Sequence, residues 1–108
     1  MGSQREMQLA ETIAHLAGDF LARESNGQSL VTVTRADMSR DLKTATIYLS
    51  VLPEKYEESA LNFAKRKRPD FREYLKEHGV LRYLPTVDFA LDMGEKNRQK
   101  IDELTRGT

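Results

Sequence analysis

The chain has 108 residues, no cysteine, and equal numbers of basic (Lys plus Arg) and acidic (Asp plus Glu) residues at 17 each. This length fits one domain spanning residues 1–108, and the lack of cysteine excludes disulfides and thiolate metal sites and suits a cytoplasmic location. No apolar run approaches a membrane span, and the balanced charge gives no overall preference for nucleic acid. We expect residues 1–3 to be a tag remnant and residues 105–108 to be frayed.

The first predicted helix covers residues 4–22. Apolar side chains recur along it at spacings of three and four, as expected for one buried helix face: Leu9, Ile13, Leu16 and Phe20. Ser25-Asn26-Gly27 follows, and Gly or Asn there favours a left-handed helix cap. These residues therefore predict where the helix ends.

Residues 31–53 predict a β-hairpin. In the second run, apolar residues alternate with polar ones over residues 44–51, which predicts one buried face and one open face. In the first run the alternation slips by one near Thr34-Arg35, which predicts a β-bulge. The polar break at Ser39-Arg40-Asp41 is typical of a hairpin turn.

A second helix is predicted over residues 54–66, followed by a break at Lys67-Arg68-Pro69. Proline removes a helical hydrogen bond, and Lys67 interrupts the apolar stripe. Asp70 and Glu73 have the spacing of a capping box for a new short helix that ends near residues 78–79.

The third predicted strand runs from about Arg82 to Asp92, with Pro85 near its start because proline cannot donate to a ladder. Asp92 and Glu95 have the capping-box spacing for a short C-terminal helix through Leu104. The resulting order, α-β-β-α-α-β-α, predicts a two-layer α+β domain with helices on one face of a three-stranded sheet.

Basic side chains are concentrated in one part of this neutral chain. Residues 65–82 contain seven basic and three acidic side chains, and such a cluster can bind a polyanion. The main candidates for contact with phosphates are Lys65, Arg66, Lys67, Arg68, Arg72 and Lys76. In helical geometry four of them would form one stripe: Lys65, Arg68, Arg72 and Lys76. The alternative is a solvated helix face on which Glu73 and Glu77 form weak ion pairs.

Three further basic residues are weaker candidates. Arg40 and Lys43 lie at the hairpin turn, where polar residues are ordinary. Arg82 suits a structural charge at the end of a strand equally well. On the open face of the hairpin, Tyr48 can stack on a base, although tyrosine is also common in exposed strands.

Residues that could support catalysis are sparse. His15 and His78 lack metal-ligand spacing, so we interpret both as structural or solvated. Asp37 and Asp41 flank the hairpin turn, and aspartate in a turn usually binds its own backbone. We therefore expect no catalytic residue, metal, cofactor or small-molecule substrate.

Two segments have a distinctive pattern. The first is Asp37-Met38-Ser39-Arg40-Asp41-Leu42 with the strand from Ala45 to Leu52, and the second is the run from Leu81 to Asp92. Both resemble segments of the bacterial ribosome-binding factor A family, and the second is similar to that family's L-R-x-x-P-x-L-x-F-x-x-D pattern. With the first helix, the resemblance covers about residues 5–104.

The resemblance implies a type II KH-like fold with an α-β-β-α-α-β core. It also implies a non-enzymatic, cytoplasmic factor that assists late maturation of the small ribosomal subunit by binding its ribosomal RNA, and we expect a monomer. Like that family, the chain has no G-x-x-G loop. Lys67-Arg68-Pro69 occupies the place of the family's Ala-x-Gly kink. Two alternatives are a KH-like protein–protein interaction module without direct RNA binding, and a small hydrolase or isomerase using the turn carboxylates.

Overall fold

The computed structural model describes residues 4–24, 27, 29–78 and 84–94. Its elements follow in the order α1 (Gln4–Glu24), β1 (Leu30–Met38), β2 (Thr44–Leu52), the short 3-10 helix η1 (Glu54–Tyr56), α2 (Glu57–Arg66), α3 (Arg68–Glu77) and β3 (Thr86–Leu91). This is the α+β fold with the α-β-β-α-α-β order predicted above. None of the helices in these ranges is long and apolar enough to cross a membrane.

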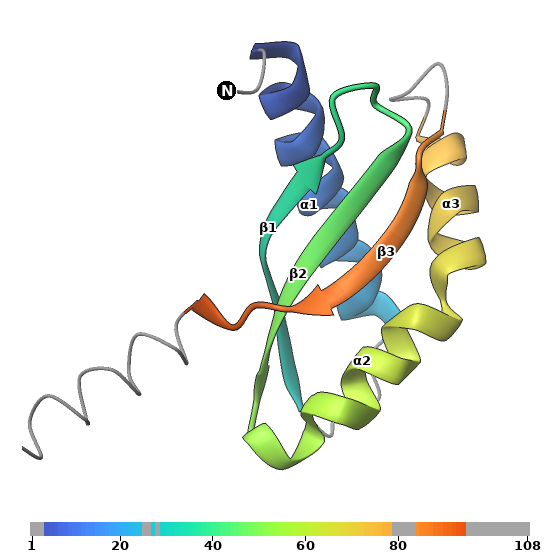
Figure 1. Ribbon diagram of the computed structural model, residues 1–108. Coiled ribbons are helices and arrows are strands. Elements are labelled where there is room, and N and C mark those ends of the chain that lie inside the picture. The colour runs from blue at the N-terminus through green and yellow to red at the C-terminus, as the bar shows by residue number, and fades with distance from the viewer. Residues whose placement is uncertain (1–3, 25–26, 28, 79–83, 95–108) are drawn as a thin grey trace, which may run out of the picture.

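The three strands form one sheet in the order β1-β2-β3, with α1 behind it in Figure 1. β1 and β2 are antiparallel, whereas β2 and β3 are parallel. The apolar residues of β2 that alternate with polar ones all point to the helix side and are buried: Ala45, Ile47, Leu49 and Val51. The alternation along this strand therefore separates a helix-covered face from an open face.

The β-bulge predicted near Thr34-Arg35 is confirmed. Val33 pairs with Leu49 and Arg35 with Tyr48, so Thr34 is the extra residue. A bulge changes which face the following side chains occupy. After it, Arg35 and Asp37 lie on the open face, while Ala36 and Met38 pack against the core.

The core lies between the sheet and the helices α1 and α3. Helix α1 contributes Ile13, Leu16, Ala17, Phe20 and Leu21. The Phe71 ring of α3 lies between two others, with centroids 5.3 Å from Phe20 and 5.9 Å from Phe89. These tilted aromatic contacts join α1, α3 and β3 and hold the second half of the chain on the sheet.

The predicted start of the third helix is wrong. Helix α3 begins at Arg68 rather than Asp70, and Lys67 alone separates it from α2. Pro69 is accommodated in the first turn of α3, where its missing N–H has no helical partner to lose. The capping box of Asp70 and Glu73 does not form, because Lys67 is the N-cap and, among the described residues, no side chain caps the helix.

The third strand is shorter than predicted. It begins at Thr86 rather than Arg82 and ends at Leu91. Pro85 cannot donate to the ladder, and the amide of Thr86 makes the first bond there, to the carbonyl of Lys43 at 2.8 Å. Arg82 and most of the predicted C-terminal helix lie outside the described residues, as do residues 1–3 and 105–108.

Candidate nucleic-acid interface

The α2–α3 junction carries six of the predicted contact residues. Lys65 and Arg66 end α2, Lys67 is the link, and the remaining three lie on α3: Arg68, Arg72 and Lys76. These last three are spaced by four residues and share one helix face. Lys65 belongs to the other helix, so the break divides the predicted stripe.

Lys65 and Arg68 are brought together by one carboxylate of β3. Asp88 Oδ1 lies 3.1 Å from Arg68 Nη1 and 3.7 Å from Lys65 Nζ. The same oxygen accepts a hydrogen bond from the amide of Phe89 at 2.8 Å. Asp88 therefore ties the junction to the sheet, and two cations share a single negative charge there.

Lys67 has two acidic neighbours. Its Nζ lies 3.6 Å from Glu24 Oε2 at the end of α1 and 3.8 Å from Asp70 Oδ2. Partly exposed pairs of this kind contribute about 0–1 kcal/mol, so they orient the side chain more than they stabilise the fold. Lys67 is thus engaged in linking α1 to the junction.

The other three cations of the junction are exposed: Arg66, Arg72 and Lys76. Among the described residues, none of the three forms an ion pair, unlike Lys65, Lys67 and Arg68. Arg72 and Lys76 follow one another by one helical turn, each next to a buried residue of α3, Phe71 or Leu75. Their charge is therefore available to an external anion.

The hairpin turn holds the other two described candidates, Arg40 and Lys43. Both are exposed, and Lys43 immediately precedes β2. The turn is organised by Ser39, whose hydroxyl donates to Asp41 Oδ1 at 2.6 Å. That bond, followed by one from the Lys43 amide, lowers the pKa of the Asp41 carboxyl from its ordinary 3.8. Asp41 belongs to the turn, and Asp37 is paired with Arg35 at 2.8 Å. The turn interpretation is therefore supported for Asp41, whereas Asp37 lies in β1 and is held by an ion pair instead.

The histidines are also engaged locally. His15 Nε2 lies 3.4 Å from Asp19 Oδ2 on the exposed side of α1. His78 Nδ1 lies 2.8 Å from the Tyr74 carbonyl oxygen, and its ring is 4.1 Å from that of Tyr74. Within the described ranges, no group of three or more His, Cys, Asp or Glu side chains could hold a metal ion.

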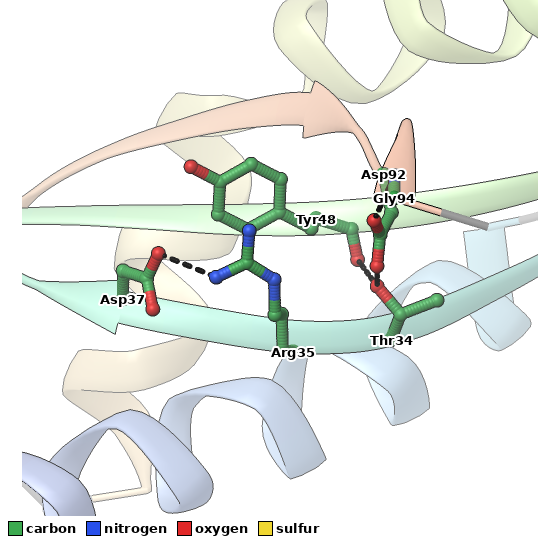
Figure 2. A network of polar contacts seen from close by, with 6 residues as sticks. All are labelled: Thr34, Arg35, Asp37, Tyr48, Asp92 and Gly94. Carbon is green, nitrogen blue, oxygen red and sulfur yellow. Dashed lines mark hydrogen bonds and ion pairs between the residues drawn. The ribbon is translucent and has the colours of Figure 1, made fainter. Parts of the chain in front are cut away.

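Sequence reasoning did not identify a cluster on the open face of the sheet (Figure 2). The Arg35 guanidinium lies over the Tyr48 ring, 4.0 Å from its centroid. Beside it the Thr34 hydroxyl donates to Asp92 Oδ2 at 2.6 Å, which joins β1 to the chain after β3. The bulge is the sequence signal that could have identified this cluster, because it determines which residue of β1 lies opposite Tyr48.

Sequence comparisons point to one family. The family model described as Ribosome-binding factor A matches residues 5–105. A curated protein of that name from Pelagibacter ubique is 35% identical over 113 residues, covering 98% of this chain and 91% of its own length. Another from a Bradyrhizobium strain is 31% identical over 110 residues, covering 97% of this chain and 80% of its own length.

Structural comparison gives the same fold. The crystal structure of ribosome-binding factor A from Thermus thermophilus aligns with a TM-score of 0.71 and 21% identity, covering 80% of this chain and 94% of that chain. A homology model of the Thermus thermophilus factor, fitted into a cryo-EM map of a 30S-RbfA complex, aligns with a TM-score of 0.70 and 20% identity, covering 81% and 94%.

Proposed function

This chain belongs to the ribosome-binding factor A family, and from that premise we propose that it binds the small ribosomal subunit and assists its late maturation by contacting ribosomal RNA. Relatives covering nearly the whole chain carry the name of a ribosome-binding factor. A homology model of the Thermus thermophilus factor, similar in fold, was fitted into the cryo-EM map of a 30S-RbfA complex, which makes the small subunit the partner to test. In this proposal the protein acts in the cytoplasm as a monomer without catalysis.

The observation that carries the RNA contact is the set of exposed cations at the α2–α3 junction that have no ion-pair partner among the described residues: Arg66, Arg72 and Lys76. A cation already paired with a carboxylate must lose that partner before it binds phosphate. A free, exposed cation has no such competitor. When it binds a phosphate, counterions are released from the RNA, and this release favours binding. These three residues are therefore the principal phosphate contacts in the proposal.

The remaining basic residues have secondary roles. Lys65 and Arg68 share Asp88, so together they retain an excess positive charge beside β3. Lys67 is held by Glu24 and Asp70. Arg40 and Lys43 lie at the hairpin turn and would provide a second, smaller contact.

Reversing the free charges tests this proposal. We expect the combined variant Arg66→Glu, Arg72→Glu and Lys76→Glu to lose co-sedimentation with salt-washed small subunits, because three attractive contacts become repulsive. The matched control is Lys55→Glu, which reverses an exposed charge on η1. Equal co-sedimentation of the triple variant and the wild type would refute the electrostatic contact.

A second candidate function is a protein–protein interaction module built on the same fold. The observation in its favour is the neutral net charge, with 17 basic and 17 acidic residues. It predicts binding to a protein partner that persists at high salt, and no binding to subunits. The two proposals therefore differ in both the partner and the salt dependence.

A further inference from the structure

We propose that the open face of the sheet carries a stacking site for one unpaired nucleobase, formed by the guanidinium of Arg35 lying on the ring of Tyr48. This inference rests on the proposed function, because it assigns a second RNA contact to the same protein. The stacking site lies on the face of the sheet opposite the core and α1 (Figure 1). The free cations Arg66, Arg72 and Lys76 lie instead on α2 and α3.

The stacking surface is already assembled in the protein. The bulge at Thr34 places Arg35 directly opposite Tyr48, with the guanidinium carbon 4.0 Å from the ring centroid. Further along β1, Asp37 Oδ2 lies 2.8 Å from Arg35 Nη1 and holds the guanidinium in this position. One face of the planar guanidinium is covered by the tyrosine, and the Arg35 side chain remains 53% exposed. A nucleobase can stack on its outer face, as bases do on arginine planes in RNA-binding proteins.

Next to this surface the protein forms an open groove of about 810 Å³. Its walls include Arg35, Tyr48 and Ser50 on the strands and Asp92, Met93 and Gly94 after β3. Clefts that bind small molecules have volumes of about 300–1,000 Å³, and the volume of this groove falls in that range. Figure 2 shows Asp92 meeting Thr34 at one side of the network.

The groove also offers hydrogen-bonding groups for the edge of a base. Asp92 Oδ2 accepts from the Thr34 hydroxyl and Oδ1 from the Gly94 amide at 3.0 Å. Each carboxylate oxygen has a further lone pair, so Asp92 can accept from the amino group of a base. Adenine, cytosine and guanine carry such a group, and uracil does not.

The phosphates adjoining this base would meet Lys65 and Arg68. Both contact Asp88, and the register places Asp88 beside Thr46 and Ala90 beside Tyr48. The strand carrying Arg35 is two strand spacings from β3, roughly 10 Å. A single-stranded backbone crosses that distance in a few nucleotides. The shared carboxylate leaves excess positive charge at this edge, which complements phosphate.

A binding assay with single-stranded RNA tests the inference. The probe is a fluorescent oligoribonucleotide of mixed sequence, measured by anisotropy at fixed low salt. We expect Arg35→Lys, which keeps the charge but removes the plane, to weaken binding about tenfold, within the range for loss of one stacked base. Tyr48→Val should weaken binding similarly because the supporting ring is lost, whereas Tyr48→Phe should bind as the wild type does.

Two controls make the result specific. Lys55 lies over the Tyr56 ring at 5.2 Å, a similar pair outside the groove, and Lys55→Ala should bind as the wild type does. An abasic oligonucleotide of the same length should bind Arg35→Lys and wild type equally, because no base remains to stack. Circular dichroism identifies any variant that has lost its fold.

The outcomes separate this inference from the proposed function. Full RNA binding by Arg35→Lys, or a loss confined to Tyr48→Val, would overturn the guanidinium stacking site. The stacking site would also be overturned if Arg35→Lys bound small subunits poorly but bound single-stranded RNA normally. That result would indicate a protein contact on this face. The variant with Arg66→Glu, Arg72→Glu and Lys76→Glu could bind subunits as the wild type does while Arg35→Lys binds RNA weakly. That combination would refute the proposed junction contact and support the stacking site.

Discussion

At the scale of single residues, Asp92 holds the chain that follows β3 against the sheet through both its backbone and its side chain. The Asp92 amide donates to the Leu49 carbonyl at 2.8 Å, and its side chain accepts from Thr34. The Thr34 hydroxyl lowers the pKa of Asp92 from its ordinary 3.8, with further contributions from the Gly94 amide and the charge of Arg35. Thr34 makes this contact because the bulge leaves it without a paired residue on β2.

This linkage predicts a pH-dependent effect of Thr34→Val, which replaces the hydroxyl with a group of the same shape. The pKa of Asp92 is depressed in the folded state, so its stabilisation is complete above 3.8 and is lost as the pH falls through the folded value. We expect Thr34→Val to lower the free energy of unfolding by about 1 kcal/mol at pH 7, and by less as the pH falls below 3.8.

Urea unfolding across pH measures this difference, and NMR titration of the Asp92 carboxyl should show its pKa rise in the variant. Thr32→Val is the matched control, because Thr32 lies on the same strand and has no side-chain hydrogen bond within the described residues. An equal loss of stability in both variants, independent of pH, would mean that the Thr34 hydroxyl has no special role.

At the scale of elements, the α2–α3 junction combines a helix break with a contact to the sheet. Lys67 still donates its amide to the carbonyls of Phe63 and Ala64, so α2 ends with these groups satisfied. The Phe71 amide donates to the Lys67 carbonyl at 2.9 Å and starts α3 immediately. A one-residue link of this kind fixes the direction of α3, and with it the direction in which Arg72 and Lys76 point.

Asp88 neutralises part of the junction, and removing its charge should strengthen subunit binding. Asp88→Asn keeps an oxygen that can accept from the Phe89 amide, yet frees about one positive charge on Lys65 and Arg68. We expect the slope of log K against log salt to steepen by about 0.7, the single-strand value per phosphate. Glu58→Gln, an exposed change on α2, should leave the slope unaltered. A shallower slope in Asp88→Asn would contradict this assignment.

The sequence predicted the element order, the alternation of β2 and the bulge, because each depends on local periodicity. It misplaced the start of α3, since Pro69 has two acceptable positions, after a break or within a first turn, and packing of Phe71 selects the second. The basic residues are identified by their clustering and spacing along the sequence. Their division into paired and free cations depends on Glu24 and Asp88, which are distant in sequence and reach the junction only in the fold.

At the scale of the whole molecule, the neutral net charge conceals a separation of charge. Residues 65–82 contain seven basic and three acidic side chains, and residues 1–30 contain two and four. Such separation gives a neutral protein one surface that attracts a polyanion. The affinity of that surface should depend on the free cations rather than on the total number of basic residues.

The central claim is that three free cations bind RNA phosphates on the small subunit, and a salt series tests it most directly. The three free cations of the wild type should together contribute about −2.1 to the slope of log K against log salt for co-sedimentation with salt-washed small subunits, or roughly a 20-fold loss of affinity between about 50 and 200 mM. The variant with Arg66→Ala, Arg72→Ala and Lys76→Ala should lose that contribution and keep only the shallower slope of the secondary contacts. Wild-type binding that is indifferent to salt would contradict the account.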